Sequence, residues 1–519
     1  MERRGNVSSD EEGEYSYRLC HLYETTNSLQ AEDFHPRPGF PHNKDAHGYG
    51  GPLHIEPADT TPLADRFLES WQSKGLPYVP DMFSTGETPN GCGHAMRTTW
   101  QGSRATAADY ITKDKQRPNV SIWCDATVDK LILERDADGT LSAKGVEFVD
   151  NEKNKYKVYA KKEVLLAGGT YNSPTMLLRS GIGPRADLEA LNIPVNLDLP
   201  GVGKNLQDHQ LIFTYYELSE PNLTDDARVN HDPDAYESGY TEWKDKKTGW
   251  LATFPFGAFA FARLNDRLDK ESAEWRAFPR EAGRDPMALT ETQPSVEFFN
   301  TVCYGGPPEY TDKPKAGEWA LALACFLCGQ QSRGYVTIKS TDPFEPPFAD
   351  PKYLDDKRDL IMLSEGVRFA NEMILTGSGT KDIVKGSWPA GATHHLNKTN
   401  EDWHDHVKKY ASSEFIWFLH VRECQYADIC PPSASYHPVG TCKMGKPDDP
   451  LAVVDQYLRV RGVKGLRVID CSVMPLVMSG HTQMPAYGIA EKAAEYIQQA
   501  GAVRAVESSA KADQVSARL

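Results

Sequence analysis

The sequence predicts an α/β fold with a second, α+β domain, and three observations support this fold class. Val164 begins an apolar run over 164–167 that leads into Gly168-Gly169 and a helical pattern. Such a run is typical of a strand buried on both faces of a parallel sheet. Residues 465–469 form a second apolar strand pattern, and a helical pattern follows over 486–499. Residues 210–350 carry separate β-rich runs joined by polar loops, which predicts an antiparallel sheet.

Local patterns predict the other elements in chain order. Apolar residues at helical spacing predict helices over 63–74 and 356–376. A short helix is expected over 104–111 and a polar helix over 401–410. Ser173-Pro174 is expected to begin a helix that Gly181 ends. β-Rich runs predict strands over 120–124, 127–134, 144–149, 156–160, 211–218, 258–264, 295–304 and 320–327. The aromatic stretch 415–418 suits core packing better than a substrate pocket, and the polar tail from Val503 is expected to fray.

The composition is that of a globular protein, and the charge narrows the classes of partner. The 519 residues are 39% hydrophobic and 25% charged, enough for two or three domains. A net charge of -16 argues against nucleic acid or anionic membranes as partners. No apolar run has the length of a membrane span, and the absence of a visible signal peptide favours the cytoplasm. Cys325 and Cys328 form the sole Cys-x-x-Cys pair, so we expect buried thiols and no metal.

Two loops near the C-terminus each carry one histidine in a setting rich in Gly, Pro and Ser. His437 lies in the loop 435–445, and His481 lies in the stretch 470–485. A lone histidine is usually a hydrogen-bonded core residue, but α/β proteins place their chemistry in loops between a strand and a helix. A neutral histidine can accept the proton of an alcohol hydroxyl, and a second can hold that hydroxyl or the resulting oxyanion. A helix opening near Pro485 would stabilise negative charge on an electron-accepting ring.

The loop His437-Pro438-Val439-Gly440-Thr441-Cys442-Lys443-Met444-Gly445 resembles the "HPxGTCxMG" segment of the glucose-methanol-choline (GMC) flavin oxidoreductases. Ser479-Gly480-His481 resembles that family's second active-site segment. The stretches 169–183 and 199–209 are similar to two further family segments. The resemblance begins around residues 15–22 and covers nearly everything to about Gln499.

The resemblance implies an FAD-binding domain built from separated chain segments and a substrate domain with an antiparallel sheet. The expected divisions are an N-terminal region 1–118, a part of the FAD-binding domain 119–209, the substrate domain 210–430, the C-terminal FAD-binding part 431–500 and a tail 501–519. The resemblance also implies that His437 is the catalytic base and that His481 is its partner. The implied FAD contacts are Val128, Ala167, Gly168, Gly169, Asp470, His481, Thr482, Gln483, Met484 and Pro485.

The activity that the resemblance implies is FAD-dependent oxidation of a small-molecule alcohol to an aldehyde or ketone. Hydride would pass to flavin N5, and the electrons would go on to oxygen or another acceptor, as in fungal small-molecule biosynthesis. Two alternatives stay open: a non-redox lyase with a structural flavin, and an inactive truncated member. Residues 181–186 fit the fingerprint GxGxxA, but they follow a helix and so do not indicate nicotinamide binding.

Family members open with a strand, a GxGxxG turn and a helix, and this sequence lacks that unit. The nearest stretch, 48–52, follows no apolar strand. We therefore expect an incomplete gene product or a diverged member. Such a chain should bind FAD weakly, because the diphosphate lacks oriented N–H donors, and should leave the Val164 strand with an exposed edge.

Overall fold

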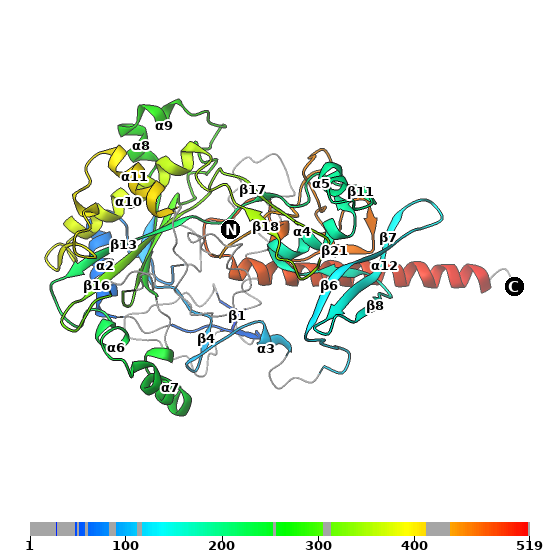
Figure 1. Cartoon of the computed structure of the whole chain (residues 1–519), viewed down its shortest axis with the longest axis horizontal. Helices are drawn as coiled ribbons and strands as arrows, with labels where there is room; N and C mark the ends of the chain where they lie inside the picture. The colour runs from blue at the N-terminus through cyan, green and yellow to red at the C-terminus, as the bar shows by residue number, and fades with distance from the viewer. Residues whose placement is uncertain are drawn as a thin grey trace.

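The computed structural model describes residues 27–28, 47–48, 51–57, 61–82, 90–111, 117–252, 256–304, 313–411 and 436–516. Two bodies of secondary structure lie side by side, one around a large antiparallel sheet and one around short parallel strands (Figure 1). The mixed α/β class expected from the sequence is confirmed, as is the separate antiparallel sheet.

The antiparallel sheet has six strands in the order β19-β13-β16-β15-β14-β3. Their bounds are Val384–Ser387, Leu211–Leu218, Ala320–Leu327, Val296–Thr301, Phe256–Ala262 and Gly91–Gly93. Four of these strands match predicted ones, and β13 and β16 match at both ends. β3 comes from the N-terminal region and pairs with β14, so this region contributes to the body around the antiparallel sheet.

Side chains alternate between the two faces of this sheet, as the two-residue period of a strand requires. On β15, Val296 and Phe298 pack into a core with helices α2 (Pro62–Ser73), α10 (Lys357–Thr376) and α11 (Asn400–Ala411). Glu297 and Phe299 point to the opposite face, where both contact His481. The helices therefore cover one face (Figure 1), and the other face is left for the histidine loops.

The second body is built around β9 (Val164–Leu166) and β21 (Leu466–Val468), which pair in parallel with Leu466 opposite Val164. The two apolar strand patterns at 164–167 and 465–469 therefore lie side by side. β6 (Ala126–Arg135), β7 (Leu141–Asp150) and β8 (Lys155–Tyr159) form an antiparallel sheet beside them, and β20 (Val463–Lys464) joins β7. Their apolar side chains share a core with α4 (Gly169–Arg179) and the start of α12 (Gln483–Ser516).

The structure has further, mostly short, helices and strands. They are β1 (Asn27–Ser28), β2 (Leu53–His54), β4 (Thr99–Trp100), β5 (Ser103–Arg104), α3 (Ala108–Ile111), β10 (Ile182–Gly183), α5 (Arg185–Ala190), β11 (Leu197–Asp198), β12 (Lys204–Leu206), α6 (Asp226–Val229), α7 (Ala235–Lys246), α8 (Asn265–Glu271), α9 (Ala273–Ala277), β17 (Gly334–Thr337) and β18 (Phe348–Asp350).

Several local predictions were wrong. Residues 120–124 form no strand: Ile122 and Trp123 are 55% and 61% exposed, because no partner strand lies beside them. The predicted helix 104–111 is reduced to α3, since Arg104 lies in β5. α12 continues to Ser516, so the tail expected to fray is helical that far. The aromatic stretch 415–418 lies outside the described residues.

The apolar sequence of β9 predicted a strand buried on both faces, and this prediction was wrong. Leu165 is 41% exposed, while Val164 and Leu166 are buried. β9 pairs only with β21 among the strands that the structure describes, so its second edge is open there.

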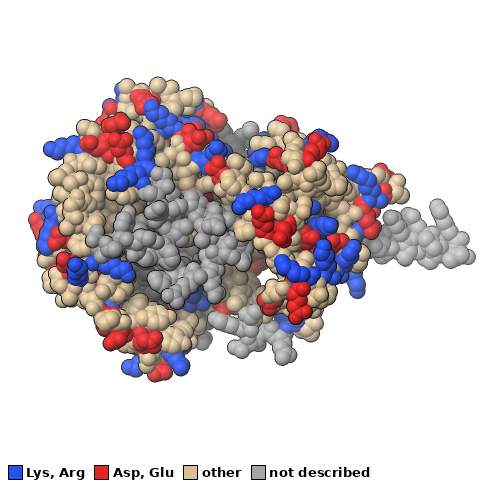
Figure 2. All heavy atoms as spheres, viewed as in Figure 1, with Lys and Arg blue, Asp and Glu red and all other residues tan. Residues whose placement is uncertain are grey.

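Charged side chains of both signs are interspersed over the face shown in Figure 2. Within the described ranges, no helix is long and apolar enough to cross a membrane. The same ranges contain no cluster of three or more His, Cys, Asp or Glu side chains suited to a metal ion. Cys325 and Cys328 are buried free thiols, and burial raises the pKa of both above the usual value.

Candidate active site

The loop that carries His437 is held against the chain just before β13. Gln207 and Val439 exchange two backbone hydrogen bonds, of 3.1 and 2.8 Å. The His437 backbone N–H donates to Asp208 Oδ1 over 2.8 Å. Gly440 has a φ of 96°, and a Cβ there would lie 2.4 Å from the Asn205 carbonyl oxygen, so this turn requires glycine. The backbone position of His437 is therefore fixed.

A proline in α4 provides a second anchor for the same loop. Pro174 lies inside the helix and has no N–H, so it cannot donate to the carbonyl of Thr170 four residues earlier. That carbonyl instead accepts a hydrogen bond from Thr441 Oγ1 over 2.6 Å. Thr170 Oγ1 in turn donates to the Pro438 carbonyl over 2.6 Å. The predicted helix start at Ser173-Pro174 was wrong, because α4 begins at Gly169.

Three histidines meet beside this loop. The ring centroids of His437 and His481 are 4.9 Å apart, so the predicted convergence of these two side chains is confirmed. His209, two residues before β13, has its Nδ1 3.1 Å from Nδ1 of His437. Its Nε2 lies 2.8 Å from the Met478 carbonyl oxygen. The cluster thus draws on three separate segments of the chain.

Burial sets the charge of two of these rings. His437 is partly buried beside two other histidines, and this burial, followed by repulsion from His481 and His209, lowers its pKa well below the usual value. Burial likewise lowers the pKa of His209 to about 3. Both imidazoles are therefore neutral at physiological pH, which is the state in which a histidine can accept a proton.

His481 is held by an acid on the open face of the antiparallel sheet. Its Nε2 lies 2.9 Å from Oε1 of Glu297, whose side chain is fully buried. The Oε2 atom of Glu297 has no hydrogen-bond partner among the described residues. Because Nε2–H donates to this carboxylate, that nitrogen of His481 is directed to the sheet and not to a substrate.

Aromatic side chains of the sheet form the wall around the histidines. The ring of Phe326 lies 5.6 Å from His437 and stacks on His481 at 5.8 Å. Phe259 and Phe299 lie 6.0 and 6.3 Å from His481. These aromatic rings are apolar, so charges near the histidines interact more strongly than they would in water.

Buried Arg97 lies against the same wall. Its guanidinium is 4.7 Å from the ring centre of Phe259 and donates to the Gly257 carbonyl over 2.9 Å. Burial lowers the pKa of Arg97 to about 9, and the charge of Glu297 opposes this shift. The wall therefore contains both a carboxylate and a guanidinium.

The predicted cofactor contacts at the ends of the parallel strands lie together. Gly168 N–H donates to Ser173 Oγ over 3.0 Å, and Gly169 N–H donates to Asp470 Oδ2 over 3.0 Å. Ser173 Oγ donates to the same carboxylate oxygen over 2.5 Å. This network joins the turn after β9, which begins at Ala167, to the loop after β21. Val128 lies farther along on β6, where its carbonyl accepts from Arg179 over 3.3 Å.

The remaining predicted contacts, Thr482, Gln483, Met484 and Pro485, form the start of α12. The helix begins at Gln483, three residues earlier than predicted, and two residues after His481. Gln483 Oε1 accepts from Thr98 Oγ1 over 3.3 Å. The positive end of the helix dipole therefore lies close to the histidine cluster.

These residues fit the ring end of FAD but supply no diphosphate site. Neutral histidines and a helix N-terminus are suited to a ring that takes up electrons and negative charge. A diphosphate needs several oriented N–H donors. In the turn after β9 the N–H groups of Gly168 and Gly169 already donate to Ser173 and Asp470.

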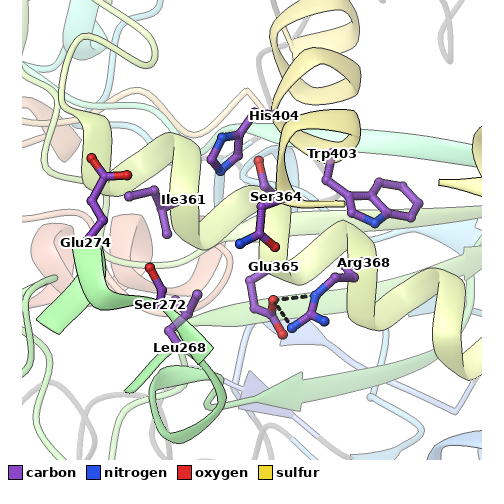
Figure 3. A pocket seen from close by; sticks show the side chains of 10 residues that line it. Leu268, Ser272, Glu274, Ile361, Ser364, Glu365, Arg368, Trp403 and His404 are labelled. Atoms are coloured by element: carbon purple, nitrogen blue, oxygen red, sulfur yellow. Dashed lines mark hydrogen bonds and ion pairs between the residues drawn. The ribbon is translucent and has the colours of Figure 1, made fainter. Parts of the chain in front are cut away.

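A small pocket elsewhere is unrelated to this cluster. It is lined by Leu268, Glu274, Ile361, Glu365, Arg368, Trp403 and His404, among others (Figure 3). These residues belong to α8, α9, α10 and α11, on the helix-covered side of the sheet. Glu365 accepts from Arg368 in this view and also from Arg267. The pocket is therefore separated from the histidines by the sheet.

Two site residues were missed in the sequence, although each had a signal. His209 ends a stretch that resembles a family segment, directly before the apolar strand β13. Glu297 is an acid flanked by the apolar residues Val296, Phe298 and Phe299 in a β-rich run. A charged side chain is rarely fully buried without a partner, so it indicated a specific contact.

Two sequence models of one family match the chain. Both are described as GMC oxidoreductase; the N-terminal model matches residues 5–211 and the C-terminal model matches residues 330–490. The matched ranges include all three histidines of the cluster.

Curated relatives agree with these matches. The mitochondrial choline dehydrogenase of Homo sapiens is 32% identical over 461 residues, which cover 87% of this chain and 66% of the relative. A glucose dehydrogenase (FAD, quinone) of Drosophila pseudoobscura pseudoobscura is 30% identical over 447 residues, 85% of this chain and 62% of the relative. The chain thus spans slightly less than two thirds of the length of these relatives.

Solved structures share the fold. A formate oxidase of Aspergillus oryzae RIB40 superposes with a TM-score of 0.78 at 24% identity, covering 93% of this chain and 78% of the other. The pyridoxine 4-oxidase from Mesorbium loti gives a TM-score of 0.67 at 25% identity, and the match covers 93% of this chain and 77% of the other. The family and the names of these relatives support FAD as the cofactor. The chain belongs to the GMC oxidoreductase family.

Proposed function

We propose that the protein oxidises the hydroxyl of a small-molecule alcohol to an aldehyde or ketone, with FAD as the electron acceptor and His437 as the base. The observation that carries the proposal is the neutral His437 ring 4.9 Å from His481, beside the N-terminus of α12. FAD, when bound, supplies the acceptor for the hydride of the carbinol carbon.

The chain's own residues would handle the proton. His437 is neutral because burial lowers its pKa, so its ring can take the hydroxyl proton as the carbon–hydrogen bond weakens. A general base of this kind contributes roughly 10²- to 10⁴-fold to the rate. Glu297 orients His481, whose ring edge then lies next to the same hydroxyl. His481 would therefore position the alcohol relative to His437.

The start of α12 and the parallel-strand turn would hold the cofactor. Thr482, Gln483, Met484 and Pro485 would surround the ring end, where the helix dipole favours negative charge. Ala167, Gly168 and Gly169 would contact the adenine side through their backbone, and Val128 would add a further contact. Asp470, which accepts from Gly169 N–H, would lie toward the ring end.

The substrate class follows from the wall. Phe259, Phe299 and Phe326 surround His481, so an alcohol with an apolar or aromatic group next to its carbinol carbon would be bound there. The same proposal includes reoxidation of the reduced flavin by oxygen or another acceptor. It also includes a role in small-molecule biosynthesis.

Flavin absorbance tests the proposal. The purified chain is incubated with FAD under anaerobic conditions, unbound flavin is removed, and benzyl alcohol is added as the probe. Bleaching of the flavin with one benzaldehyde formed per flavin is the expected result. Cleavage of mandelonitrile to benzaldehyde without bleaching would instead identify a lyase, and bound flavin inert to a panel of alcohols would refute the redox assignment.

A further inference from the structure

His209 is the most enclosed of the three histidines in the cluster. Its side chain is completely buried, and its ring lies 4.2 Å from that of Phe326. Its Nε2 lies 2.8 Å from the carbonyl oxygen of Met478. A carbonyl oxygen can only accept a hydrogen bond, so Nε2 of His209 must carry the proton that is donated.

The other nitrogen of His209 is then an acceptor. Burial lowers the pKa of His209 to about 3, so the ring is neutral and carries a single proton. Because that proton is on Nε2, Nδ1 carries a lone pair and can accept a hydrogen bond. Nδ1 faces His437, whose own Nδ1 is 3.1 Å away.

This assignment fixes the proton on His437. A hydrogen bond between the two Nδ1 atoms needs one donor, and His209 cannot supply it. His437 must therefore donate its Nδ1–H. Its ring is also neutral, since burial lowers its pKa well below the usual value, so its Nε2 carries no proton. Within the described part of the chain, no hydrogen bond engages that Nε2.

We propose that His209 is a positioning residue that holds His437 in the Nδ1–H tautomer and thereby presents Nε2 as the proton acceptor. The inference rests on the proposed function only in naming His437 as the base. The preceding residue strengthens it, because Asp208 Oδ1 accepts the backbone N–H of His437 over 2.8 Å. Two consecutive residues thus fix the backbone and the ring of His437.

The alternative arrangements conflict with the contacts. If His209 carried its proton on Nδ1, its Nε2 lone pair would face the Met478 carbonyl oxygen at 2.8 Å, and two acceptors would repel each other. If His209 carried protons on both nitrogens, a cation would be completely buried beside Phe326 with a histidine and a carbonyl as its contacts.

The tautomer is measured on the purified chain by ¹⁵N NMR after incorporation of ring-labelled histidine. The spectrum of a His437→Ala variant assigns the His437 signals by subtraction. The chemical shift of each ring nitrogen reports whether it bears a proton. No substrate or turnover is needed, so this result is independent of whether the alcohol oxidation is correct.

Two variants separate a tautomer effect from a structural one. His209→Asn places an amide oxygen near the Nδ1 position and keeps an acceptor for His437. His209→Gln keeps a donor for Met478 but moves the amide away from His437. We expect the wild type and the Asn variant to show His437 protonated on Nδ1 and bare on Nε2, and the Gln variant to lose this preference.

In wild type, a His437 signal with Nε2 protonated would overturn the proposal without any variant. An unchanged His437 tautomer in a folded Gln variant would overturn it as well. Where benzyl alcohol proves to be a substrate, the Gln variant should lower kcat by about 10- to 100-fold with little change in KM, and the Asn variant should recover most of it.

Discussion

Asp470 joins the loops that follow the two parallel strands, and its replacement tests how the cofactor-side turn is held. One oxygen accepts from Gly169 N–H over 3.0 Å and from Ser173 Oγ over 2.5 Å. The other accepts from Ser472 N–H over 2.9 Å. The bonds from Gly169 and Ser173 connect residues about 300 positions apart in the sequence, and the bond from Ser472 is local. Asp470→Ala removes all of them at once.

The expected cost follows from the three bonds. A hydrogen bond contributes roughly 1 kcal/mol net, and up to about 3 kcal/mol when one group is charged. The bonds are not independent, and water can replace part of the loss because Asp470 is only partly buried. We therefore expect Asp470→Ala to lower the free energy of unfolding by about 2 to 4 kcal/mol. For a cooperative unit of about 200 residues this corresponds to a fall in Tm of about 5 to 10 °C.

Thermal unfolding followed by circular dichroism measures the effect. Asp470→Asn should recover only part of the loss, because its NH₂ group would face a donor at Gly169 or Ser472. The matched control is Asp198→Asn, an exposed aspartate that also accepts a backbone N–H, from Arg185 over 3.1 Å. Asp198→Asn should lower the free energy of unfolding by less than about 1 kcal/mol. A Tm for Asp470→Ala that matches this control would refute the argument.

Two further predictions concern charge. Burial holds the pKa of His209 and His394 at about 3 in the folded state, so below pH 6.5 the unfolded chain binds protons that the folded chain does not. The free energy of unfolding then falls as pH falls from about 6.5 toward 3, by up to about 1.4 kcal/mol per pH unit for each histidine. Tm measured from pH 7 to 5 should show this fall. His394→Phe should make the dependence of Tm on pH less steep. Glu297→Gln replaces the carboxylate that accepts a hydrogen bond from His481 with a weaker, neutral acceptor. The variant should lower kcat about 10- to 100-fold in steady-state assays. Glu217→Gln, at a partly exposed acid paired with Lys385, should leave kcat unchanged, and equal effects of both variants would count against a specific role for Glu297.

Elements with strong local patterns were predictable from the sequence. β16 matches its predicted bounds because eight apolar residues in a row lie in a buried central strand. α10 begins one residue after the Asp356 cap, which accepts the Arg358 N–H over 2.9 Å. The loops of His437 and His481 were also located correctly, because glycine and proline confine each histidine to a turn.

The errors arose where distant parts of the chain decide the structure. Residues 120–124 have β-forming side chains, but a strand needs a partner that the local sequence cannot supply. Pro174 was taken as a helix start, yet Thr441 satisfies the carbonyl that the proline leaves free. Glu297 and His209 gain their roles from contacts with His481 and His437 that lie 184 and 228 residues away in the chain.

The rate at which an alcohol reduces the bound flavin, compared between wild type and His437→Ala, tests the central claim most directly. The comparison is made by anaerobic stopped-flow absorbance with benzyl alcohol, at equal flavin occupancy. Loss of a general base predicts a fall of about 10²-fold or more in the variant. A variant that retains bound flavin and is reduced at nearly the wild-type rate would contradict the assignment of His437 as the base.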